Sequence, residues 1–402
     1  MQTTPKANRL HIGIFGKRNV GKSTLMNTLL NQAISIVSDT AGTTTDAVEK
    51  SMEFLPIGPV VFIDTAGIDD IGELGEQRIE KTKKVFDRTD VAIIVCDSDG
   101  WSHYEKALFD EFAERKIPTI AVINKQDISP IDKNKLDEIK KVVSEPILLS
   151  LKKSENVVDK IKTELIKICP DDFITPPSIL GDLVKAQDTV VMVIPIDKEA
   201  PKGRLILPQV QVIRDLLDNN CKILITQTNE LKNALSELKK TAALVITDSQ
   251  AFAEVAKDVP DEISLTSFSI LFARMKGDLQ EFCEGAKTIS ELKDNDKVLI
   301  CESCSHHQIE DDIAKVKIPN LITKKTGKKL EFIYKSGHDF EENLSQYALI
   351  IHCGACMTNR REVLSRIMKC KKANVPITNY GITIAYCIGI LDRATKPFKI
   401  EK

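Results

Sequence analysis

The sequence predicts an α/β protein that begins with a doubly wound parallel-sheet domain and continues with two further α/β domains. Short apolar runs of strand length alternate with stretches of helix length through most of the chain. This alternation indicates parallel sheets, because successive parallel strands need a crossover connection that is usually a helix. A chain of 402 residues is long enough for two or three domains, and we expect three.

The first domain is expected over residues 7–170. Its predicted strands are the apolar runs Leu10–Phe15, Val60–Ile63, Val91–Cys96, Thr119–Ile123 and Pro146–Leu149. A break follows at Cys169-Pro170-Asp171-Asp172 and at Thr175-Pro176-Pro177, where prolines disfavour a helix and favour an extended linker.

The second domain is expected over residues 171–265 and the third over 266–402. The second has predicted strands at Thr189–Ile194, Lys222–Thr226 and Ala243–Ile246 and predicted helices at Val210–Leu217 and Leu231–Leu238. The third is expected to begin with one long helical stretch, Ile270–Leu292, and to continue with strands at Lys297–Ile300, Glu331–Tyr334 and Ala348–Ile351.

Charge and hydropathy argue against nucleic-acid and membrane partners. The 56 basic and 58 acidic residues give a formal net charge of -2, so no global field favours a polyanion. No apolar run approaches the roughly 20 residues that a membrane-spanning helix needs, and residues 1–9 are too short and polar for a signal peptide. We therefore expect a soluble, cytoplasmic protein.

The ten cysteines are expected to be buried thiols or metal ligands, because a cytoplasmic protein keeps its thiols reduced. Six of them are scattered along the chain, and four form a group: Cys301, Cys304, Cys353 and Cys356.

A phosphate loop follows the first predicted strand. Gly16-Lys17-Arg18-Asn19-Val20-Gly21-Lys22-Ser23 fits the pattern G-x-x-x-x-G-K-S and opens a predicted helix. Lys22 is expected to neutralise the β- and γ-phosphates and Ser23 to reach Mg²⁺. The expected phosphate-binding residues are Gly16, Asn19, Val20, Gly21, Lys22, Ser23 and Thr24.

Two later motifs predict how the nucleotide is read. Asp64-Thr65-Ala66-Gly67 follows a strand, so Asp64 can lie over Mg²⁺ while the amide of Gly67 faces the γ-phosphate. Asn124-Lys125-Gln126-Asp127 ends another strand, and Asp127 can accept hydrogen bonds from N1–H and the exocyclic amine of guanine. Ser150 and Leu151 suit a backbone amide at the guanine carbonyl, so we expect GTP as the nucleotide.

This region resembles the translation-factor-related GTPases, and among them the branch that modifies tRNA or matures ribosomes. Ala41-Gly42-Thr43-Thr44-Thr45-Asp46 resembles their first switch, which implies that Thr44 binds Mg²⁺. The resemblance implies a catalytic set of Lys22, Thr44, Asp64 and Gly67.

Two positions bear on how GTP is hydrolysed. Ile68 stands where Ras-like enzymes carry a water-orienting glutamine, so catalysis has to draw on another group. Asn19 resembles the asparagine with which this branch holds K⁺, which implies potassium-stimulated hydrolysis. The alternative is that Asn19 only forms a turn.

The grouped cysteines form a second site. Cys304-Ser305-His306 and His352-Cys353-Gly354-Ala355-Cys356 each follow a predicted strand, and parallel strands bring such loops to the same carboxyl edge of a sheet. A helix is expected to begin near Thr358 or Asn359, with Glu362 as a capping partner. Three thiolates suit an iron-sulfur cluster, whereas the double pair that includes Cys301 suits zinc, although its halves lie farther apart than in zinc ribbons.

The arrangement Cys-x-His followed by His-Cys-x-x-Cys closely resembles the signature of the HydF family, GTPases that mature iron-iron hydrogenase. The resemblance implies a 4Fe-4S cluster on Cys304, Cys353 and Cys356, with His306 and His352 as candidates for its fourth ligand and Cys301 as a bystander. Ile196-Asp197-Lys198-Glu199-Ala200-Pro201-Lys202-Gly203-Arg204 and Pro208-Gln209 resemble the family's middle domain, which implies a homodimer.

The family resemblance also implies a function for the cluster. It implies a scaffold that accepts a diiron precursor, made with the help of the radical maturases HydE and HydG, and transfers it to iron-iron hydrogenase. A tRNA or ribosome maturation GTPase with a structural zinc site is the alternative, and it predicts a basic carboxyl-terminal face that binds RNA.

Overall fold

The computed structural model describes residues 4–32, 38–40, 47–67, 81–143, 145–153, 156–174, 178–196, 205–303, 312–338 and 340–398. The chain divides into two compact units, Met1–Pro176 and Pro177–Lys402. The division falls inside the predicted proline-rich linker. The expectation that this whole segment is extended was wrong, because α6 (Asp171–Ile174) forms a short helix directly after Pro170, where proline is compatible with a helix start.

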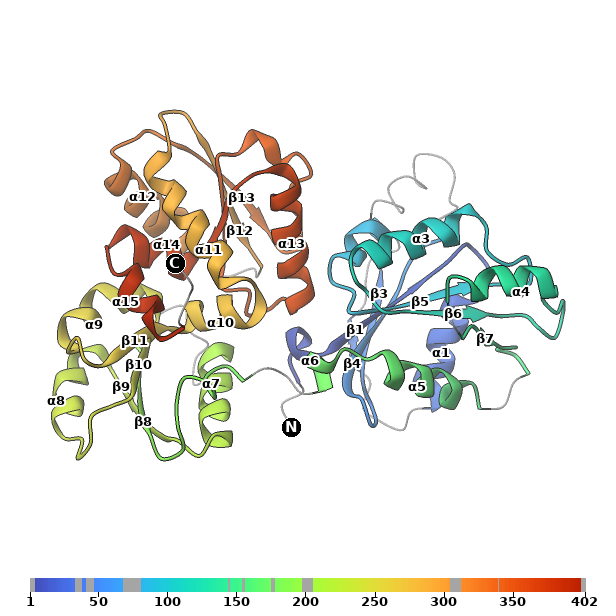
Figure 1. Ribbon diagram of the computed structural model, residues 1–402, viewed down its shortest axis with the longest axis horizontal. Helices are drawn as coiled ribbons and strands as arrows, with labels where there is room; N and C mark the ends of the chain where they lie inside the picture. Colours follow the sequence, from blue (N-terminus) through green and yellow to red (C-terminus); the bar gives the residue numbers. More distant parts are fainter. Residues whose placement is uncertain are drawn as a thin grey trace. The chain divides into compact units, whose positions relative to one another are not determined.

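A seven-stranded sheet forms the centre of the first unit (Figure 1). Five parallel strands confirm the predicted runs, and they are β1 (Leu10–Phe15), β4 (Gly58–Asp64), β5 (Val91–Cys96), β6 (Thr119–Ile123) and β7 (Ile147–Leu148). Strands β2 (Ser38–Thr40) and β3 (Val48–Phe54), which extend the sheet in antiparallel order next to β4, were not predicted.

Helices cover both faces of this sheet, which confirms the doubly wound class (Figure 1). On one face α1 (Lys22–Gln32) and α5 (Val157–Ile168) bury Leu25, Leu29, Ile161 and Leu165. On the other face, α3 (His103–Glu114) and α4 (Lys133–Lys140) bury Phe112 and Ile139. The carboxyl ends of the parallel strands are thereby left open between the helix layers.

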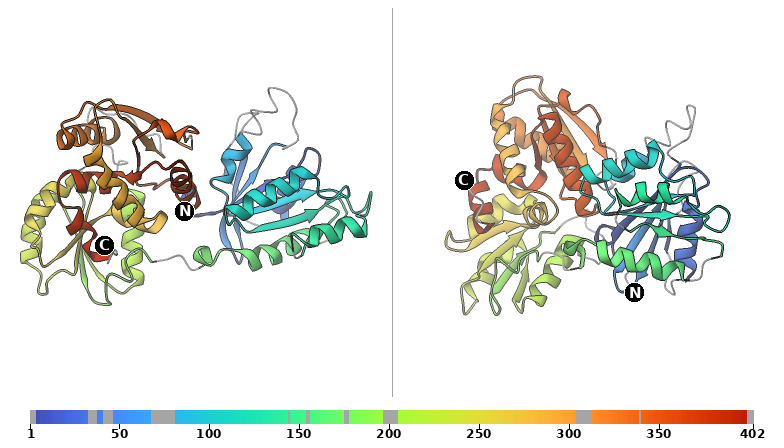
Figure 2. Two further views of the ribbon diagram at one scale, coloured as in Figure 1. Left: turned by 45° about the horizontal axis from the view of Figure 1, so that its top comes forward. Right: turned by 45° about the vertical axis from the view of Figure 1, so that its right-hand side comes forward.

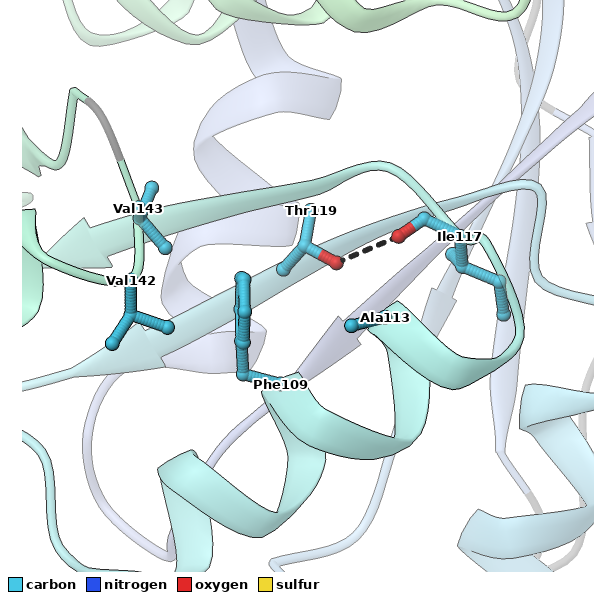
Figure 3. Close-up of a pocket in the computed structure, with 6 residues that line it drawn as sticks. All are labelled: Phe109, Ala113, Ile117, Thr119, Val142 and Val143. Atoms are coloured by element: carbon cyan, nitrogen blue, oxygen red, sulfur yellow. Dashed lines mark hydrogen bonds between the residues drawn. The ribbon is translucent and has the colours of Figure 1, made fainter.

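The first unit also has a small pocket of about 200 Å³ beside α3 (Figure 3). It is lined by Phe109 and Ala113 of α3 and by Ile117, Thr119, Val142 and Val143. Thr119 begins β6, so the pocket lies at the amino ends of the strands. The nucleotide motifs follow the carboxyl ends, at the opposite edge.

A four-stranded parallel sheet begins the second unit, in the order β11-β10-β8-β9. Its strands are β8 (Thr189–Val193), β9 (Lys222–Thr226), β10 (Leu244–Thr247) and β11 (Ser264–Ser267), of which the short, polar β11 was not predicted. One face is covered by α7 (Leu207–Asp218) and the other by α8 (Leu231–Ser236) and α9 (Phe252–Asp258). Strand β9 is left at an edge.

A second four-stranded parallel sheet completes this unit, in the order β13-β12-β14-β15. The part of the chain that forms it is drawn in orange to red in Figure 2. Its strands are β12 (Lys297–Glu302), β13 (Glu331–Ser336), β14 (Leu349–His352) and the unpredicted β15 (Ile377–Asn379). The helices around it are α11 (Leu279–Lys287), α12 (Ile318–Thr326), α13 (Arg360–Ala373), α14 (Tyr380–Cys387) and α15 (Leu391–Thr395). Strands β12 and β14 are neighbours, which confirms that the two cysteine loops leave the same edge.

The long helical stretch expected over Ile270–Leu292 is present but is interrupted at Gly277 and Asp278. The chain forms α10 (Phe268–Lys276) and then α11, because Gly277 ends the first helix and Asp278 caps the second by accepting a hydrogen bond from the amide of Glu281 at 3.1 Å. Phe272 of α10 packs in the core of the middle sheet, and Ile270 packs in the core shared with the last sheet. Helix α10 therefore connects the two sheets.

The division into domains at residues 170 and 265 stays a prediction. Strand β11 lies across the second of these boundaries and pairs with β10. Within the described part of the chain, none of the helices has both the length and the apolar character that crossing a bilayer requires.

Candidate functional site

The phosphate loop joins β1 to α1 in a conformation that requires glycine. Gly16 and Gly21 have φ values of 142° and 107°, a region that residues with a side chain rarely adopt. A Cβ atom on Gly16 would lie 2.2 Å from the carbonyl oxygen of Val95, and one on Gly21 would lie 2.4 Å from Nδ2 of Asn124. Neither position has room for a side chain, so the loop can approach phosphates with its backbone amides.

Lys22 and Asp64 supply the charges at this loop. The ammonium of Lys22 donates to the carbonyls of Gly16 and Lys17, at 2.9 and 2.6 Å, and is held across the loop. Asp64 ends β4, where burial raises the pKa of its carboxyl while Ser23 and Lys22 oppose that shift. Oδ1 of Asp64 is buried and has no partner among the described residues. Ser23 and Asp64 therefore form a hydroxyl and carboxylate pair that fits Mg²⁺.

Asn124 connects the phosphate loop to the two loops expected at the base. Its Nδ2 donates to the carbonyl of Val20 at 2.8 Å, and its Oδ1 accepts from the amide of Leu151 at 3.1 Å. Ser150 and Lys153 lie against Asp127 and lower the pKa of its carboxyl, so this group is ionised near neutral pH. The arrangement brings Asp127 and Leu151, expected at the guanine ring, to the edge that carries Lys22.

Some of the predicted nucleotide residues lie outside the described residues. These are Thr44, with the rest of the segment 41–46, and Ile68. Gly67 is described and lies three residues after β4, and Thr24 lies in the first turn of α1. Asn19 adopts a left-handed φ of 60° and Lys125 one of 62°, and both values are typical of tight loops.

The cysteine loop after β14 lies against the end of β12. The amide of Ser303 donates to the sulfur of Cys353 at 3.2 Å, and the thiol of Cys353 lies 3.3 Å from the Ser303 hydroxyl. Cys353 is buried and Cys356 is partly exposed. Cys304 and His306 lie outside the described residues, which end at Ser303 on this side of the gap. The residue before Cys304 therefore contacts Cys353.

His352 is held by protein groups on both ring nitrogens. Its Nε2 lies 2.9 Å from Nη1 of Arg366, and its Nδ1 lies 2.8 Å from the carbonyl oxygen of Cys353. Burial and the guanidinium of Arg366 lower the pKa of His352 to about 4, so the ring is neutral. A neutral ring that accepts from Arg366 donates with its other nitrogen to Cys353, and this fixes the backbone of the cysteine loop.

Arg366 belongs to a buried network on α13. Its guanidinium also donates to the carbonyl of Gly337 at 2.9 Å and to the carboxylate of Glu362, which in turn contacts Nδ1 of His338 at 2.9 Å. Asn359 caps the helix, and its Oδ1 accepts from the amide of Glu362 at 3.2 Å. The predicted helix start is confirmed, while the Glu362 side chain binds Arg366 and His338.

A buried lysine supports the cysteine loop from the preceding helix. Lys276, at the end of α10, is 3% exposed, and its ammonium donates to the carbonyls of Ala355, Cys356 and Thr358 at 2.7, 3.4 and 2.8 Å. Burial lowers the pKa of Lys276 to about 8, against the opposing effect of the Cys356 and Cys353 thiolates. A cation is thus placed against the backbone of the cysteine loop.

Cys301 differs from the loop cysteines. It lies inside β12, where it is 1% exposed and burial raises the pKa of its thiol to about 12. Among the residues that the structure describes, no three histidine, cysteine or acidic side chains lie close enough to hold a metal ion.

The described loop residues nevertheless fit an iron-sulfur cluster. They provide two sulfur atoms, a backbone amide donating to one of them, and the buried Lys276 ammonium, all of which suit an anionic sulfur-ligated group. Lys276 and Arg366 were not predicted as residues of this site. The only available signal was a charged residue within an apolar or amphipathic helix.

Three family models match successive parts of the chain. Residues 11–125 match a model described as a 50S ribosome-binding GTPase. Residues 179–277 match the hydrogen maturase F dimerization domain, and residues 280–397 match the hydrogen maturase F tetramerization domain. The chain belongs to the hydrogen maturase F family. Its first unit is a GTPase domain, and its two later domains are those that the family models name for oligomerisation.

Relatives of the first part are GTPases with other names. GTPase Der of a Nitratiruptor species is 33% identical over 172 residues, which are 40% of this chain and 37% of that protein. The tRNA modification GTPase MnmE of Lactobacillus helveticus is 35% identical over 166 residues, which are 40% of this chain and 34% of that protein. This hydrogen maturase F chain therefore spans about a third of the length of these curated relatives.

Among solved structures, Era in complex with MgGDPNP and nucleotides 1506-1542 of 16S ribosomal RNA is similar to the chain with a TM-score of 0.34 and 24% identity. The match covers 54% of this chain and 92% of that chain.

Proposed function

We propose that the first unit binds GTP with Mg²⁺ and hydrolyses it. The pair of Ser23 and Asp64 binds the metal ion, Lys22 neutralises the phosphates, and the amide of Gly67 senses the γ-phosphate. Asp127 selects guanine. The glycines of the phosphate loop support this assignment, because neither has room for a Cβ atom. Oδ1 of the Asp64 carboxylate also supports it, since this buried oxygen has no hydrogen-bond partner among the described residues.

Hydrolysis is proposed to depend on K⁺ held by Asn19, with Thr44 as a second Mg²⁺ ligand. A cation at the phosphates can supply the charge that an arginine finger supplies elsewhere, where it is worth about 10³ to 10⁵ in rate. The test compares GTP turnover in potassium and sodium chloride at equal ionic strength. Faster turnover in K⁺ by wild type, and not by Asn19→Ala, is expected; equal rates in the two salts contradict the proposal.

We infer that the second unit holds a 4Fe-4S cluster on Cys304, Cys353 and Cys356. The single observation that carries this inference is the hydrogen bond from the Ser303 amide to the sulfur of Cys353, because it joins the loops that carry the two halves of the motif. When bound, the cluster supplies an iron atom with an exchangeable ligand. His352 is proposed to hold the loop through its backbone, which leaves His306 or a non-protein group for the fourth position.

The whole chain is proposed to be a scaffold that accepts a diiron precursor, made with the help of HydE and HydG, and transfers it to iron-iron hydrogenase. The matches to two hydrogen maturase F domains support this reading over an RNA maturation GTPase with structural zinc. GTP binding and hydrolysis would act as a timer, by favouring different arrangements of the chain in the two nucleotide states.

Cluster transfer can be tested directly. The chain is isolated from cells that also make HydE and HydG and is mixed anaerobically with apo iron-iron hydrogenase, and hydrogen evolution is followed. Wild type is expected to activate the hydrogenase, while Cys353→Ala fails and Cys221→Ala, a substitution of a buried thiol in the middle domain, retains activity. Lack of activation by wild type, or equal activation by Cys353→Ala, contradicts the scaffold function.

A further inference from the structure

Tyr380 lies beside the cysteine loop at the edge of the last sheet. It is the first residue of α14 and directly follows β15, which pairs in parallel with β14. The register places Asn379 of β15 opposite His352 of β14. The residues that directly follow this pair are Tyr380 and Cys353. Sheet register therefore brings the tyrosine to the position next to a proposed cluster ligand.

The hydroxyl of Tyr380 is buried and has no partner in the described part of the chain. The residue is 8% exposed, and its phenolic oxygen forms no hydrogen bond with any described residue. A buried hydroxyl that lacks a partner costs about 1 to 3 kcal/mol, and phenylalanine would fill the same space without this cost. The buried hydroxyl thus indicates that a bound group, rather than a described residue, accepts its hydrogen bond.

The surroundings of Tyr380 favour an O–H donor. Burial raises the pKa of Tyr380 well above its ordinary value, and negative charge at Cys353, Glu302, Cys301 and Asp312 raises it further. The phenol therefore keeps its proton and can donate to an electron-rich group. The ammonium of Lys276 is bound to three carbonyls of the cysteine loop, which leaves the tyrosine as a separate donor.

We propose that the hydroxyl of Tyr380 donates a hydrogen bond to an electron-rich acceptor bound in front of Cys353. The acceptor is either a sulfide of the cluster or the ligand on its open iron atom, and the inference rests on the proposed 4Fe-4S site. In both cases Tyr380 stabilises negative charge at the site. It acts as a recognition residue for the bound group, with no part in holding the apo fold.

Tyr380→Phe in the full chain tests this role, with Thr383→Val as the control. Thr383 lies one turn later in α14 and is also buried, and its hydroxyl likewise finds no partner among the residues that the structure describes. Without a cluster, Tyr380→Phe is expected to melt at the same temperature as wild type or higher, because it removes only an unpaired polar group. A clear loss of apo stability would assign the hydroxyl a structural role and overturn the proposal.

The proteins are then reconstituted anaerobically with iron and sulfide, and two quantities are measured. One is the reduction potential of the cluster, and the other is the dissociation constant for added cyanide, followed by electron paramagnetic resonance. If the acceptor is a sulfide, Tyr380→Phe lowers the potential; a tenfold change in the reduction equilibrium corresponds to about 59 mV for one electron. If the acceptor is the exchangeable ligand, the dissociation constant for cyanide rises about tenfold.

The outcomes separate this inference from the function on which it rests. Either change in Tyr380→Phe, with Thr383→Val like wild type, supports the proposal and identifies the acceptor. A potential and a cyanide affinity that both equal those of wild type overturn it and leave the cluster in place. A wild-type protein that takes up no iron and sulfide overturns both the proposed function and this inference.

Discussion

At the scale of single residues, the base recognition that we propose depends on one carboxylate. Asp127 lies at the edge of the sheet that carries the phosphate loop, and the lowered pKa that Ser150 and Lys153 impose keeps it ionised. An ionised carboxylate accepts both hydrogen bonds that guanine offers on this side and donates none. Its replacement by an amide should exchange the preferred base.

Asp127→Asn is expected to weaken GTP binding at least about a hundredfold and to allow binding of xanthosine triphosphate. Two charge-assisted hydrogen bonds are lost with guanine, each worth about 1.5 to 3 kcal/mol, whereas the amide can donate to the extra carbonyl of xanthine. Titration with fluorescent analogues of both nucleotides measures the two affinities. Unchanged GTP affinity would remove Asp127 from the base site.

His352 illustrates what residue patterns leave undecided. The sequence places it next to Cys353 and makes it a candidate ligand, but the bond to Arg366 comes from a residue on α13 that no spacing rule connects to it. The long-range contacts of Lys276 with the cysteine loop were equally inaccessible, because they depend on how α10 packs between the two sheets. By contrast, the order of the predicted strands was enough to predict that the two cysteine loops leave the same edge of the sheet.

At the scale of elements, the strands that sequence predicts best are the buried ones. The five apolar runs of the first unit all form strands, since a buried parallel strand is apolar on both faces. Of the strands that were not predicted, β15 is short and β3 is half-exposed. Such segments form strands because they pair with a neighbouring strand, which the local sequence does not reveal. The break between α10 and α11 depends on Gly277 and Asp278, whose local effect overrides the helical periodicity.

Strand β3 is tied to the rest of the first unit by Glu49. Lys6 contacts its carboxylate at 2.9 Å, and Arg88 contacts it from a distant segment. Burial raises the pKa of Glu49, but the charges of Arg88 and Lys6 outweigh it and hold the pKa at about 2, against 4.5 for the free group. The stabilisation is therefore complete above pH 4.5 and is lost as the pH falls towards 2.

Acid should destabilise the first unit partly through this group, by about 3 kcal/mol between pH 5 and pH 2. The single tryptophan, Trp101, lies in this unit, so its fluorescence during denaturant unfolding reports the first unit within the full chain. Glu49→Gln is expected to be less stable at pH 7 and to lose less stability in acid. An equal pH dependence in both proteins would show that Glu49 contributes nothing.

Helix α11 approaches β15 so closely that it requires a glycine. A Cβ atom on Gly285 would lie 2.0 Å from the carbonyl oxygen of Ile377. The backbone of a strand cannot move aside without disturbing the sheet, so helix and strand would have to separate.

Gly285→Ala should destabilise the second unit by about 1 to 3 kcal/mol, the usual cost of overpacking, despite the higher helix propensity of alanine. Glu284→Ala, on the exposed side of the same helix, should change stability by less than about 0.5 kcal/mol. Urea unfolding followed by circular dichroism measures both. A Gly285→Ala protein as stable as wild type would contradict the close packing.

At the scale of the whole molecule, the middle sheet offers a surface for a second copy. Strand β9 is an edge strand, and Ile225 on it is 47% exposed. Val210 and Leu217 of α7, which packs beside β9, are 47% and 53% exposed. Exposed apolar side chains next to an unpaired strand edge favour association, and this part of the chain matches a dimerization domain.

A charge at this surface should weaken self-association. Ile225→Asp is expected to raise the dissociation constant of the oligomer at least about tenfold, while Lys257→Asp on α9, at the other face of the sheet, leaves it unchanged. Light scattering coupled to size-exclusion chromatography over a range of concentrations measures the mass. An unchanged mass for Ile225→Asp would exclude this surface as the contact.

The chemical nature of the group at the cysteine loop decides whether the chain is an iron-sulfur scaffold. Iron, acid-labile sulfide and zinc are quantified in the anaerobically purified chain, and the reduced protein is examined by electron paramagnetic resonance. We predict about four iron and four sulfide per chain, with a signal that is lost in Cys353→Ala and kept in Cys221→Ala. A colourless protein that holds zinc and no sulfide would contradict the iron-sulfur scaffold.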